Sequence, residues 1–296
     1  MERWGTVAIV GVGLIGGSIG LSLKSRGLAA EVIGVGRSRR SLDRAEQCGA
    51  IDRATTDLSQ GVSHAEVVVV CTPVDRIAED VRRASDLTPD DVLITDVGST
   101  KRRIVETLDG QSRPSHVFVG AHPLAGSELT GVENARANLY DDRVCLVTPT
   151  SRTPDRTRQK ARAFWKSLGT RVIEMSPAEH DEILAYTSHL PHAVAAALAS
   201  SIPIDWLPLA AGAYRDSTRV AGADGQLWTA IFRENRGPLL KAIGTFLDRA
   251  SAFKYALMTD DESAISSWWE EAKHRRDRFE SLRRDDASSS GNAGSP

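Results

Sequence analysis

Three glycines near the start of the chain have the spacing of a phosphate-binding loop. Gly11, Gly13 and Gly16 follow the apolar residues 6–10 and open the amphipathic segment 14–26. In this setting the first glycine allows a tight turn, the second lets the backbone approach a pyrophosphate, and the third lets helix and strand pack closely. The pattern predicts a dinucleotide site, the alternative being a glycine-rich turn without a ligand. The predicted contacts are Gly11, Gly13, Leu14, Ile15 and Gly16, to which the hydroxyl of Ser18 could add one.

The turn after the second apolar run bears on which dinucleotide would bind. About 20 residues beyond the glycines, an acidic residue would bond the ribose 2′-hydroxyl of NAD. Gly36 stands at that place, and the residues after it are Arg37, Ser38, Arg39 and Arg40. Their guanidinium groups and hydroxyl suit a 2′-phosphate, because arginine binds phosphate oxygens in bidentate fashion. We therefore expect NADP to be favoured over NAD; the alternative is a solvated basic turn.

Other polar, glycine-punctuated segments are candidates for the rest of the site. They are residues 71–74, 95–101 and 120–128, each after an apolar run, and residues 188–192 and 214–219 in the second half of the chain. Ligands of doubly wound folds bind at the carboxyl ends of the strands, so the first three segments are expected to border the nucleotide. From them we assign Thr72, Pro73 and Asp96 to the cofactor site.

The apolar pattern predicts the elements that position these segments. Between residues 6 and 150, short β-branched runs alternate with longer amphipathic segments, which is typical of buried parallel strands in βαβ units. We predict an α/β fold with a Rossmann-type, doubly wound parallel sheet over residues 1–175. After residue 176 the strand pattern stops, and an all-α domain is expected over residues 176–284. The Ser- and Gly-rich tail, residues 285–296, is expected to be disordered.

Composition excludes several classes of protein. There are 37 Lys and Arg against 39 Asp and Glu, a net charge of −2, so no nucleic-acid partner is expected. No apolar stretch of about 18 residues could cross a bilayer, and the apolar run at residue 6 leaves no room for a signal peptide. We expect a cytoplasmic protein with no membrane partner. Cys48, Cys71 and Cys145 are widely spaced and odd in number, which favours buried thiols over disulfides or a metal site.

Taken in order along the chain, the motifs resemble those of one enzyme family. GxGLIGGS, CTPV, DVGSTK, HPLAGSE, SHLPH and RDSTRVA occur over about residues 5–235 in the order and spacing of the prephenate/arogenate dehydrogenase (TyrA) family. The resemblance implies an NAD(P)-dependent oxidoreductase that converts prephenate to 4-hydroxyphenylpyruvate and CO2 on the route to tyrosine. It also implies a homodimer formed through the helical domain, which would contribute to substrate binding as well.

The chemistry of that reaction assigns roles within the matched motifs. A cyclohexadienol that loses hydride from its carbinol carbon needs an acceptor for the hydroxyl proton, and neutral imidazole suits this near pH 7. His122 resembles the family's catalytic histidine, and Ser99 would hydrogen-bond the same hydroxyl unless it serves as a helix N-cap. Arg219 matches the family's carboxylate-binding arginine and suits the dianionic substrate. The alternative for Arg219 is an ion pair with Asp216.

Four further residues complete the predicted substrate site. His192 is assigned a hydrogen bond to the substrate, with His189 in support, and Ser127 and Glu128 are assigned to the same site from the loop after His122. His180, His189 and His192 could instead bind a metal. No carboxylate or cysteine cluster accompanies them at ligand spacing, so no metal is expected.

Two other functions stay open at this point. The enzyme could act on arogenate, or on both substrates as a cyclohexadienyl dehydrogenase. It could also be a catalytically inactive nucleotide-sensing module, which the absence of His122 or Arg219 would have favoured.

In the long helix expected at residues 263–284, the pair Trp268 and Trp269 could lie in a dimer interface or pack within one chain.

Overall fold

The computed structural model describes residues 3–109, 113, 117–126 and 129–291. The chain forms two compact units, residues 1–239 and residues 240–296. The boundary predicted from the sequence, between residues 175 and 176, separates the last strand from the helices that follow it, and as a domain boundary it stays a prediction.

One sheet of eight strands forms the centre of the first unit. Its order is β3-β2-β1-β4-β5-β6-β7-β8. The strands are β1 Trp4–Val10, β2 Ala29–Val35, β3 Arg53–Thr55, β4 Val67–Val70, β5 Leu93–Asp96, β6 Phe118–Pro123, β7 Val144–Thr148 and β8 Arg171–Glu174. Neighbouring strands run parallel except β6 and β7. The predicted Rossmann-type sheet is confirmed, with one antiparallel pair and the short edge strand β3 added to it.

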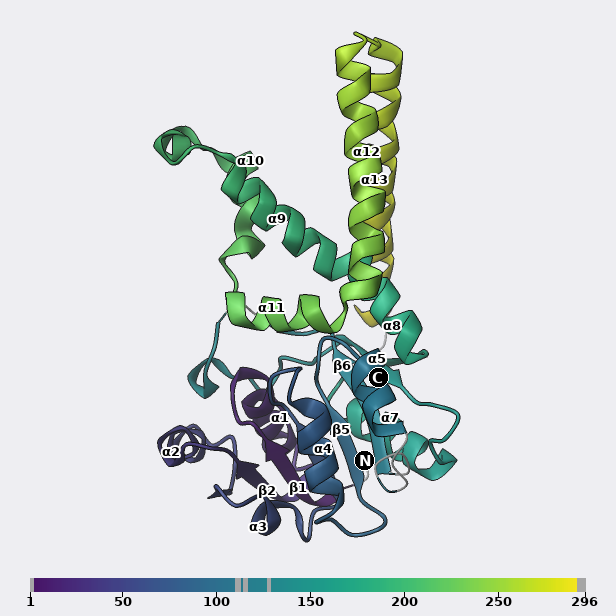
Figure 1. The fold of residues 1–296 in the computed structure, drawn as a ribbon. Helices are drawn as coiled ribbons and strands as arrows, with labels where there is room; N and C mark the ends of the chain where they lie inside the picture. Colours follow the sequence, from purple (N-terminus) through teal and green to yellow (C-terminus); the bar gives the residue numbers. More distant parts are fainter. Residues whose placement is uncertain (1–2, 110–112, 114–116, 127–128, 292–296) are drawn as a thin grey trace. The chain divides into compact units, whose positions relative to one another are not determined.

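Helices cover both faces of this sheet, which explains the uninterrupted apolar strands (Figure 1). The helices before β8 are α1 Leu14–Ser25, α2 Arg39–Gln47, α3 Leu58–Val62, α4 Ile77–Ser85, α5 Arg102–Asp109 and α7 Asp155–Ser167, with a short 3₁₀ turn, η1, at Val132–Asn134. Buried side chains of α1, α2 and α7 form one core cluster with alternate residues of the strands. Those of α3, α4 and α5 form a second cluster with the remaining strand residues.

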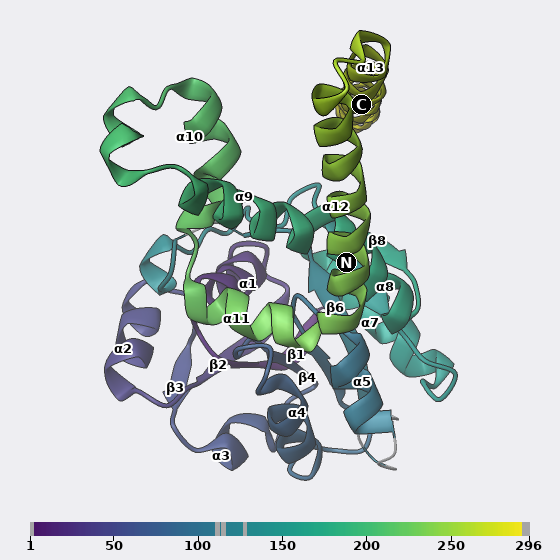
Figure 2. The same cartoon turned by 45° about the horizontal axis from the view of Figure 1, so that its top comes forward.

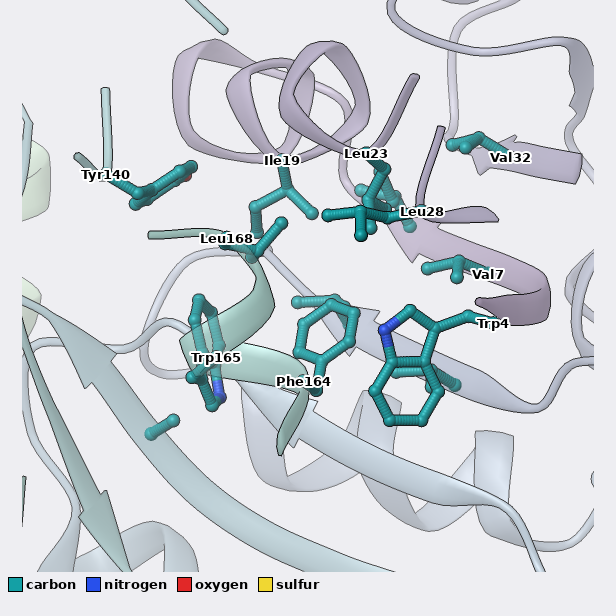
Figure 3. Packing of buried hydrophobic residues seen from close by; sticks show 14 of the residues in the cluster. Trp4, Val7, Ile19, Leu23, Leu28, Val32, Tyr140, Phe164, Trp165 and Leu168 are labelled. Carbon is teal, nitrogen blue, oxygen red and sulfur yellow. The ribbon is translucent and has the colours of Figure 1, made fainter. Parts of the chain in front are cut away.

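The first cluster is anchored by aromatic rings (Figure 3). Trp4 and Phe164 meet edge to face with ring centroids 5.7 Å apart, and Phe164 meets Trp165 in the same way at 5.4 Å. The indole of Trp165 donates a buried hydrogen bond of 3.2 Å to the hydroxyl of Thr95. Helix α7 is thereby fixed to the carboxyl end of β5, where the candidate site begins.

Among the described residues, every regular element after β8 is a helix, as predicted. The elements are α8 Pro177–Leu184, the π-helical turn η2 Ala185–His189, α9 Leu190–Ser201, η3 Ile204–Leu209, α10 Gly212–Thr218, η4 Arg219–Gly222, α11 Gly225–Glu234, α12 Arg236–Met258 and α13 Glu262–Gly291. Figure 2 shows α10 beyond the end of α9, from which the chain turns back to α11. Part of the predicted disordered tail falls on the end of α13 and part on residues 292–296, outside the described residues, so it stays a prediction.

The second unit is a hairpin of two long helices. Helices α12 and α13 lie side by side (Figure 1), with the rings of Phe253 and Trp268 stacked at 4.5 Å. The indole of Trp268 donates a 3.1 Å hydrogen bond to the carbonyl of Arg249. Trp268 therefore packs within one chain, whereas the side chain of Trp269 is 65% exposed.

Two further expectations can be compared with the described residues. No helix among them is long and apolar enough to cross a membrane. Cys145 is buried and Cys71 is half-buried, but Cys48 is exposed, and all three are free thiols. The expectation of a buried thiol is wrong for Cys48, because this residue ends α2 on its solvent side.

Candidate active site

The glycine-rich turn is shaped by close backbone contacts. Gly11 has a φ of +96°, and a Cβ there would lie 2.8 Å from the carbonyl oxygen of Cys71. A Cβ on Gly16 would lie 2.4 Å from the carbonyl oxygen of Gly11. Neither position has room for a side chain. Gly13 differs, because nothing in the structure lies within 4 Å of the place where its Cβ would be.

The N-terminus of α1 fits the phosphates of a dinucleotide. Gly13 is its N-cap residue, no side chain caps this end, and the first turn contains no acidic residue. The amide groups and the helix dipole therefore favour an anion, and Gly13 leaves open space beside them. Ser18 does not add a contact: it is fully buried, donates to the carbonyl of Leu14 and accepts from the amide of Arg136.

The first turn of α1 also meets the loop that follows β6. The carbonyl of Ile15 accepts a 2.7 Å hydrogen bond from the hydroxyl of Tyr140. A Cβ on Gly126 would lie 3.8 Å from the Ile15 side chain. The predicted phosphate site and the segment that begins with His122 thus lie next to each other.

The three arginines of the basic turn, residues 36–40, differ in their ion-pair partners. Ser38 caps α2 by accepting from the amide of Ser41 at 3.4 Å. Arg39 is paired with Asp43 at 2.8 Å and with Glu46 at 3.1 Å. Arg37 and Arg40 are exposed, and no ion pair engages them within the described part of the chain. These two guanidinium groups are the ones free to meet a 2′-phosphate.

The segment after β5 is held by a buried ion pair. The ammonium of Lys101 pairs with the carboxylate of Asp96, and both side chains are 0% exposed. The same carboxylate accepts from the amides of Gly98 at 2.8 Å and Ala121 at 3.0 Å. Asp96 thereby connects the end of β5 to β6. Its side chain is used by the protein itself, so its assignment to the cofactor gains no support from this geometry.

Thr72 and Pro73 follow β4 at the same edge of the sheet. The hydroxyl of Thr72 donates to the carboxylate of Asp80 at 2.7 Å. Pro73 is exposed. Thr72 therefore fixes the loop to α4, while the carbonyl of Pro73 accepts from the amide of Arg76 at 2.9 Å.

His122 lies near the end of β6 and begins a chain of hydrogen bonds. Its Nδ1 lies 3.0 Å from Nε2 of His180 in α8. Nδ1 of His180 lies 2.7 Å from Oδ1 of Asp181. His180 is 0% and Asp181 is 1% exposed. The sequence singled out His180 only as a possible metal ligand and did not single out Asp181 at all.

Asp181 also holds the segment that contains Ser99. Its two carboxylate oxygens accept from the amides of Lys101 at 2.8 Å and Arg102 at 3.0 Å, at the start of α5. The N-terminus of α5 is capped by a residue of another helix, so the N-cap role considered for Ser99 is not the one observed. Ser99 is half-buried in the turn before α5.

Asn235 connects this network to the helical segment. Its side-chain amide donates to the carbonyl of Asp181 at 2.7 Å and lies 2.9 Å from Nδ1 of His189. Since Nδ2 has two protons and faces a carbonyl on one side, it donates to His189 on the other. His189 therefore carries its proton on Nε2, and the backbone of Ser99 lies close to its ring. Sequence reasoning missed Asn235, which has no motif of its own.

The π-helical turn between α8 and α9 places His189 and His192. Pro191 has no amide hydrogen and cannot bond back to the carbonyl of Thr187, which favours the wider turn here. Nδ1 of His192 donates to the carbonyl of Ser188 at 2.9 Å. The ring of His192 stacks on Trp228 of α11 with centroids 3.6 Å apart. The free nitrogen of His192 is therefore Nε2.

Arg219 lies at the junction of α10 and η4 and is exposed. Burial lowers the pKa of the His192 ring, and the charge of Arg219 adds to this effect. No ion pair of Arg219 is found among the described residues, and Asp216 is paired with Arg215 at 3.3 Å. The guanidinium of Arg219 is thus not taken up by the ion pair considered as its alternative.

Burial keeps the histidines of this cluster neutral. It holds the pKa of His122 well below the usual range, with further contributions from the neighbouring His180 and Lys101. Burial also lowers the pKa of His180, and it lowers that of His189 to about 4. His122 is therefore an uncharged imidazole at neutral pH, able to accept a proton.

Most of the catalytic and substrate-binding residues predicted from the sequence lie together in one cluster. His122, Ser99, His189, His192 and Arg219 belong to one connected cluster, to which His180, Asp181, Asn235 and Trp228 are added. Ser127 and Glu128 lie outside the described residues. Within the described ranges, no three His, Cys, Asp or Glu side chains are placed to hold a metal ion.

The chain is similar to known proteins over most of its length. Residues 19–174 match the family model "Prephenate dehydrogenase, nucleotide-binding domain", and residues 176–271 match "Prephenate dehydrogenase, dimerization domain". The cyclohexadienyl dehydrogenase of Zymomonas mobilis is 32% identical over 91% of this chain and 94% of its own length. The prephenate dehydrogenase of Bacillus subtilis is 31% identical over 92% of this chain and 75% of its own.

A solved structure shows the same fold. The prephenate dehydrogenase of A. aeolicus, in complex with hydroxyphenyl propionate and NAD+, superposes with a TM-score of 0.86. It is 31% identical and covers 94% of this chain and 98% of its own. With both family models matched in sequence order and a similar structure over nearly the whole length, this chain belongs to the prephenate dehydrogenase family of oxidoreductases.

Proposed function

We propose that this protein catalyses the NAD(P)+-dependent oxidative decarboxylation of prephenate to 4-hydroxyphenylpyruvate, in the synthesis of tyrosine. The observation that carries the proposal is a neutral, half-buried imidazole, His122, whose segment lies against the first turn of α1. A proton acceptor beside a dinucleotide site is the arrangement that oxidation of a cyclohexadienol requires. Membership of the family supplies the substrate class.

The glycine-rich turn and α1 are proposed to hold the dinucleotide. Gly11, Gly13 and Gly16 form the backbone cradle, and Leu14 and Ile15 present their amides at the uncapped helix N-terminus. When bound, NAD(P)+ supplies the acceptor for the hydride that leaves the carbinol carbon. The chain's own contribution is to orient the substrate and to receive its hydroxyl proton.

His122 is the proposed proton acceptor and Ser99 its helper. The proton passes from the substrate hydroxyl to the ring nitrogen of His122 that does not face His180. Ser99 would hydrogen-bond the same hydroxyl from the turn that Asp181 holds in place. CO2 is then lost, the ring becomes aromatic, and its oxygen takes back a proton from His122, which restores the neutral imidazole; none of these steps calls for a metal.

Arg219 is proposed to bind a substrate carboxylate. Its guanidinium has no ion-pair partner in the part of the chain that the structure describes, and its planar fork suits a bidentate contact. His192 is stacked on Trp228 and its neutral ring donates from Nδ1, so Nε2 would accept one further hydrogen bond. Ser127 and Glu128 stay proposed contacts from the loop after β6.

We further propose that NADP+ is favoured over NAD+. The support comes from the absence of a carboxylate at Gly36 and from the exposed, unpaired Arg37 and Arg40. Arg39 contributes less, since its guanidinium is held by Asp43 and Glu46. The NAD+ in the A. aeolicus structure leaves this preference to measurement.

A homodimer in the cytoplasm is proposed as the working form. The helical hairpin of the second unit presents large apolar side chains to solvent, with Tyr255 68%, Met258 74% and Trp269 65% exposed. Large apolar side chains left exposed often mark protein interfaces, and the family model over residues 176–271 describes a dimerization domain. A second copy of the chain is the partner that would cover it.

Arogenate is the alternative substrate. The similarity to a cyclohexadienyl dehydrogenase favours including it, because prephenate and arogenate contain the same cyclohexadienol ring. The two differ in the side chain, where arogenate has an ammonium group in place of the keto group.

A panel of initial rates tests the proposal. Reduced cofactor is measured with prephenate and with arogenate, each with NAD+ and with NADP+, and CO2 release is measured alongside. The expected result is equimolar CO2 and NADPH from prephenate, with a smaller kcat/KM for NAD+. No turnover of either substrate by a protein that binds the dinucleotide would favour the nucleotide-sensing module instead.

A further inference from the structure

The hydrogen bonds behind His122 determine where its proton lies. Oδ1 of Asp181 accepts from the amide of Lys101, so this atom acts as an acceptor and Nδ1 of His180 must be its second donor. His180 then has its proton on Nδ1, and Nε2 of its neutral ring carries a lone pair.

The same reasoning extends one ring further. Nε2 of His180 lies 3.0 Å from Nδ1 of His122. Because Nε2 of His180 carries a lone pair and accepts, Nδ1 of His122 must be the donor. His122 therefore has its proton on Nδ1. The nitrogen with the lone pair is Nε2, the one that does not face His180 and can take a proton from outside the network.

The neutral form of His180 is essential to this result. If His180 carried a proton on both nitrogens, Nδ1 of His122 would become the acceptor and Nε2 would be blocked by a proton. Burial lowers the pKa of His180 and Lys101 adds to this effect, while Asp181 opposes it. The charged or titratable groups around His122 itself are His180, Lys101 and His189.

His180 and Asp181 act only through His122. Their side chains are 0% and 1% exposed and have no access to a ligand. Asp181 also has a purely structural contact, because it caps α5. The side chain of His180 makes no comparable structural contact among the described residues. If its role were only structural, replacing it would not change which nitrogen of His122 carries the proton.

We propose that His180 and Asp181 are positioning residues that keep the Nδ1 of His122 protonated and its Nε2 free to act as the base. This inference rests on the proposed function. When the substrate hydroxyl gives its proton to Nε2, the proton on Nδ1 stays in place, and the carboxylate of Asp181 stabilises the resulting imidazolium through His180. In this step the O–H bond of the substrate breaks and an N–H bond forms at Nε2, while the carbinol C–H bond breaks as its hydride leaves for the bound dinucleotide.

Two variants of His180 separate positioning from packing. His180→Gln places an amide oxygen near the former Nε2, where it accepts from His122, whereas His180→Leu offers no acceptor. We expect His180→Leu to lower kcat by about 10²- to 10³-fold and His180→Gln by roughly 10-fold or less, with cofactor Kd unchanged in both. The exposed His64 provides the control, since His64→Gln should leave kcat at the wild-type value.

A spectroscopic measurement tests the inference without turnover. In enzyme labelled with ¹⁵N-histidine, without substrate or cofactor, the ring nitrogens of His122 are assigned by their loss in His122→Asn. Near pH 7.5 the wild type should show a protonated Nδ1 and an unprotonated Nε2, and His180→Leu should show a mixture of tautomers.

The outcomes distinguish this inference from the proposed function. A wild-type His122 with its proton on Nε2, or a His180→Leu variant with wild-type kcat, would overturn the inference. If the wild type turned over neither prephenate nor arogenate, the proposed function would fail, while the tautomer of His122 would still be read from the spectrum. Should His180→Leu not fold, His180→Gln and the wild-type spectrum decide.

Discussion

The buried ion pair between Lys101 and Asp96 gives the sharpest stability prediction. Replacing Lys101 by Met leaves the carboxylate of Asp96 at 0% exposure without its cation. Loss of one partner of a buried pair costs about 3–5 kcal/mol. Asp96 keeps the amides of Gly98 and Ala121 as donors, so we expect a value of about 3 kcal/mol at the lower end.

Thermal unfolding measures this cost. For a domain of about 150–250 residues, 1 kcal/mol corresponds to about 2–4 °C, so Lys101→Met should lower Tm by about 6–12 °C. Lys166→Met, on the exposed face of α7, is the matched control and should change Tm by about 1–2 °C at most. Adding Asp96→Asn to Lys101→Met should recover part of the loss. Equal Tm values for Lys101→Met and Lys166→Met would refute the reasoning.

Three further predictions concern the cofactor and the histidines. Arg37→Ala should lower kcat/KM for NADP+ roughly 5- to 10-fold and change kcat/KM for NAD+ little. Arg39→Ala should have a smaller effect, because Asp43 and Glu46 already hold its guanidinium. Equal losses with both cofactors would contradict the 2′-phosphate assignment. Gly16→Val should abolish dinucleotide binding in a fluorescence titration, because its Cβ would lie 2.4 Å from the Gly11 carbonyl; wild-type Kd would contradict this. Burial lowers the pKa of His189 to about 4, so the unfolded chain takes up a proton before the folded chain does, and stability falls as the pH falls from about 6.5 towards 4. In urea titrations at several pH values His189→Asn should weaken this pH dependence, and an unchanged dependence would contradict the assignment.

The nucleotide-binding sheet could be predicted because its signal is local. Runs such as residues 67–70 are apolar at every position, and the structure buries all four residues. The pairing of β6 with β7 was not predicted as antiparallel. The described residues between β6 and β7, 124–126 and 129–143, contain no helix apart from the short turn η1, and an antiparallel neighbour needs no crossover helix. The lack of a helical pattern between these two strands was the signal that could have predicted their antiparallel pairing.

The network behind His122 could not be predicted, because its contacts join distant parts of the sequence. His180 and Asp181 are adjacent on α8 and point in directions about 100° apart, yet both are buried, which requires packing against two different elements. Nothing local indicates that one faces β6 and the other caps α5. Asn235 lies between α11 and α12 and also acts across distant segments.

The cofactor assignments also divide into those that depend on local backbone and those that depend on contacts with distant segments. The roles expected for Gly11 and Gly16 depend on their own backbone, and the close contacts at both positions are of the kind that pattern requires. Ser18 and Asp96 were assigned by their place in a motif, but both side chains are fully buried and bond within the protein. Burial depends on the neighbouring segments, residues 120–121 and 136, which the motif does not contain.

The central claim is that His122 accepts the proton during oxidation of prephenate. Its most direct test is the kcat of His122→Asn with prephenate and NADP+, together with the Kd of the cofactor for the same variant. We expect kcat to fall by about 10²- to 10⁴-fold with an unchanged Kd, and the wild-type rate to fall on acidification only below about pH 6.5, because the pKa of His122 is lowered. A kcat within a few-fold of the wild type would contradict the claim.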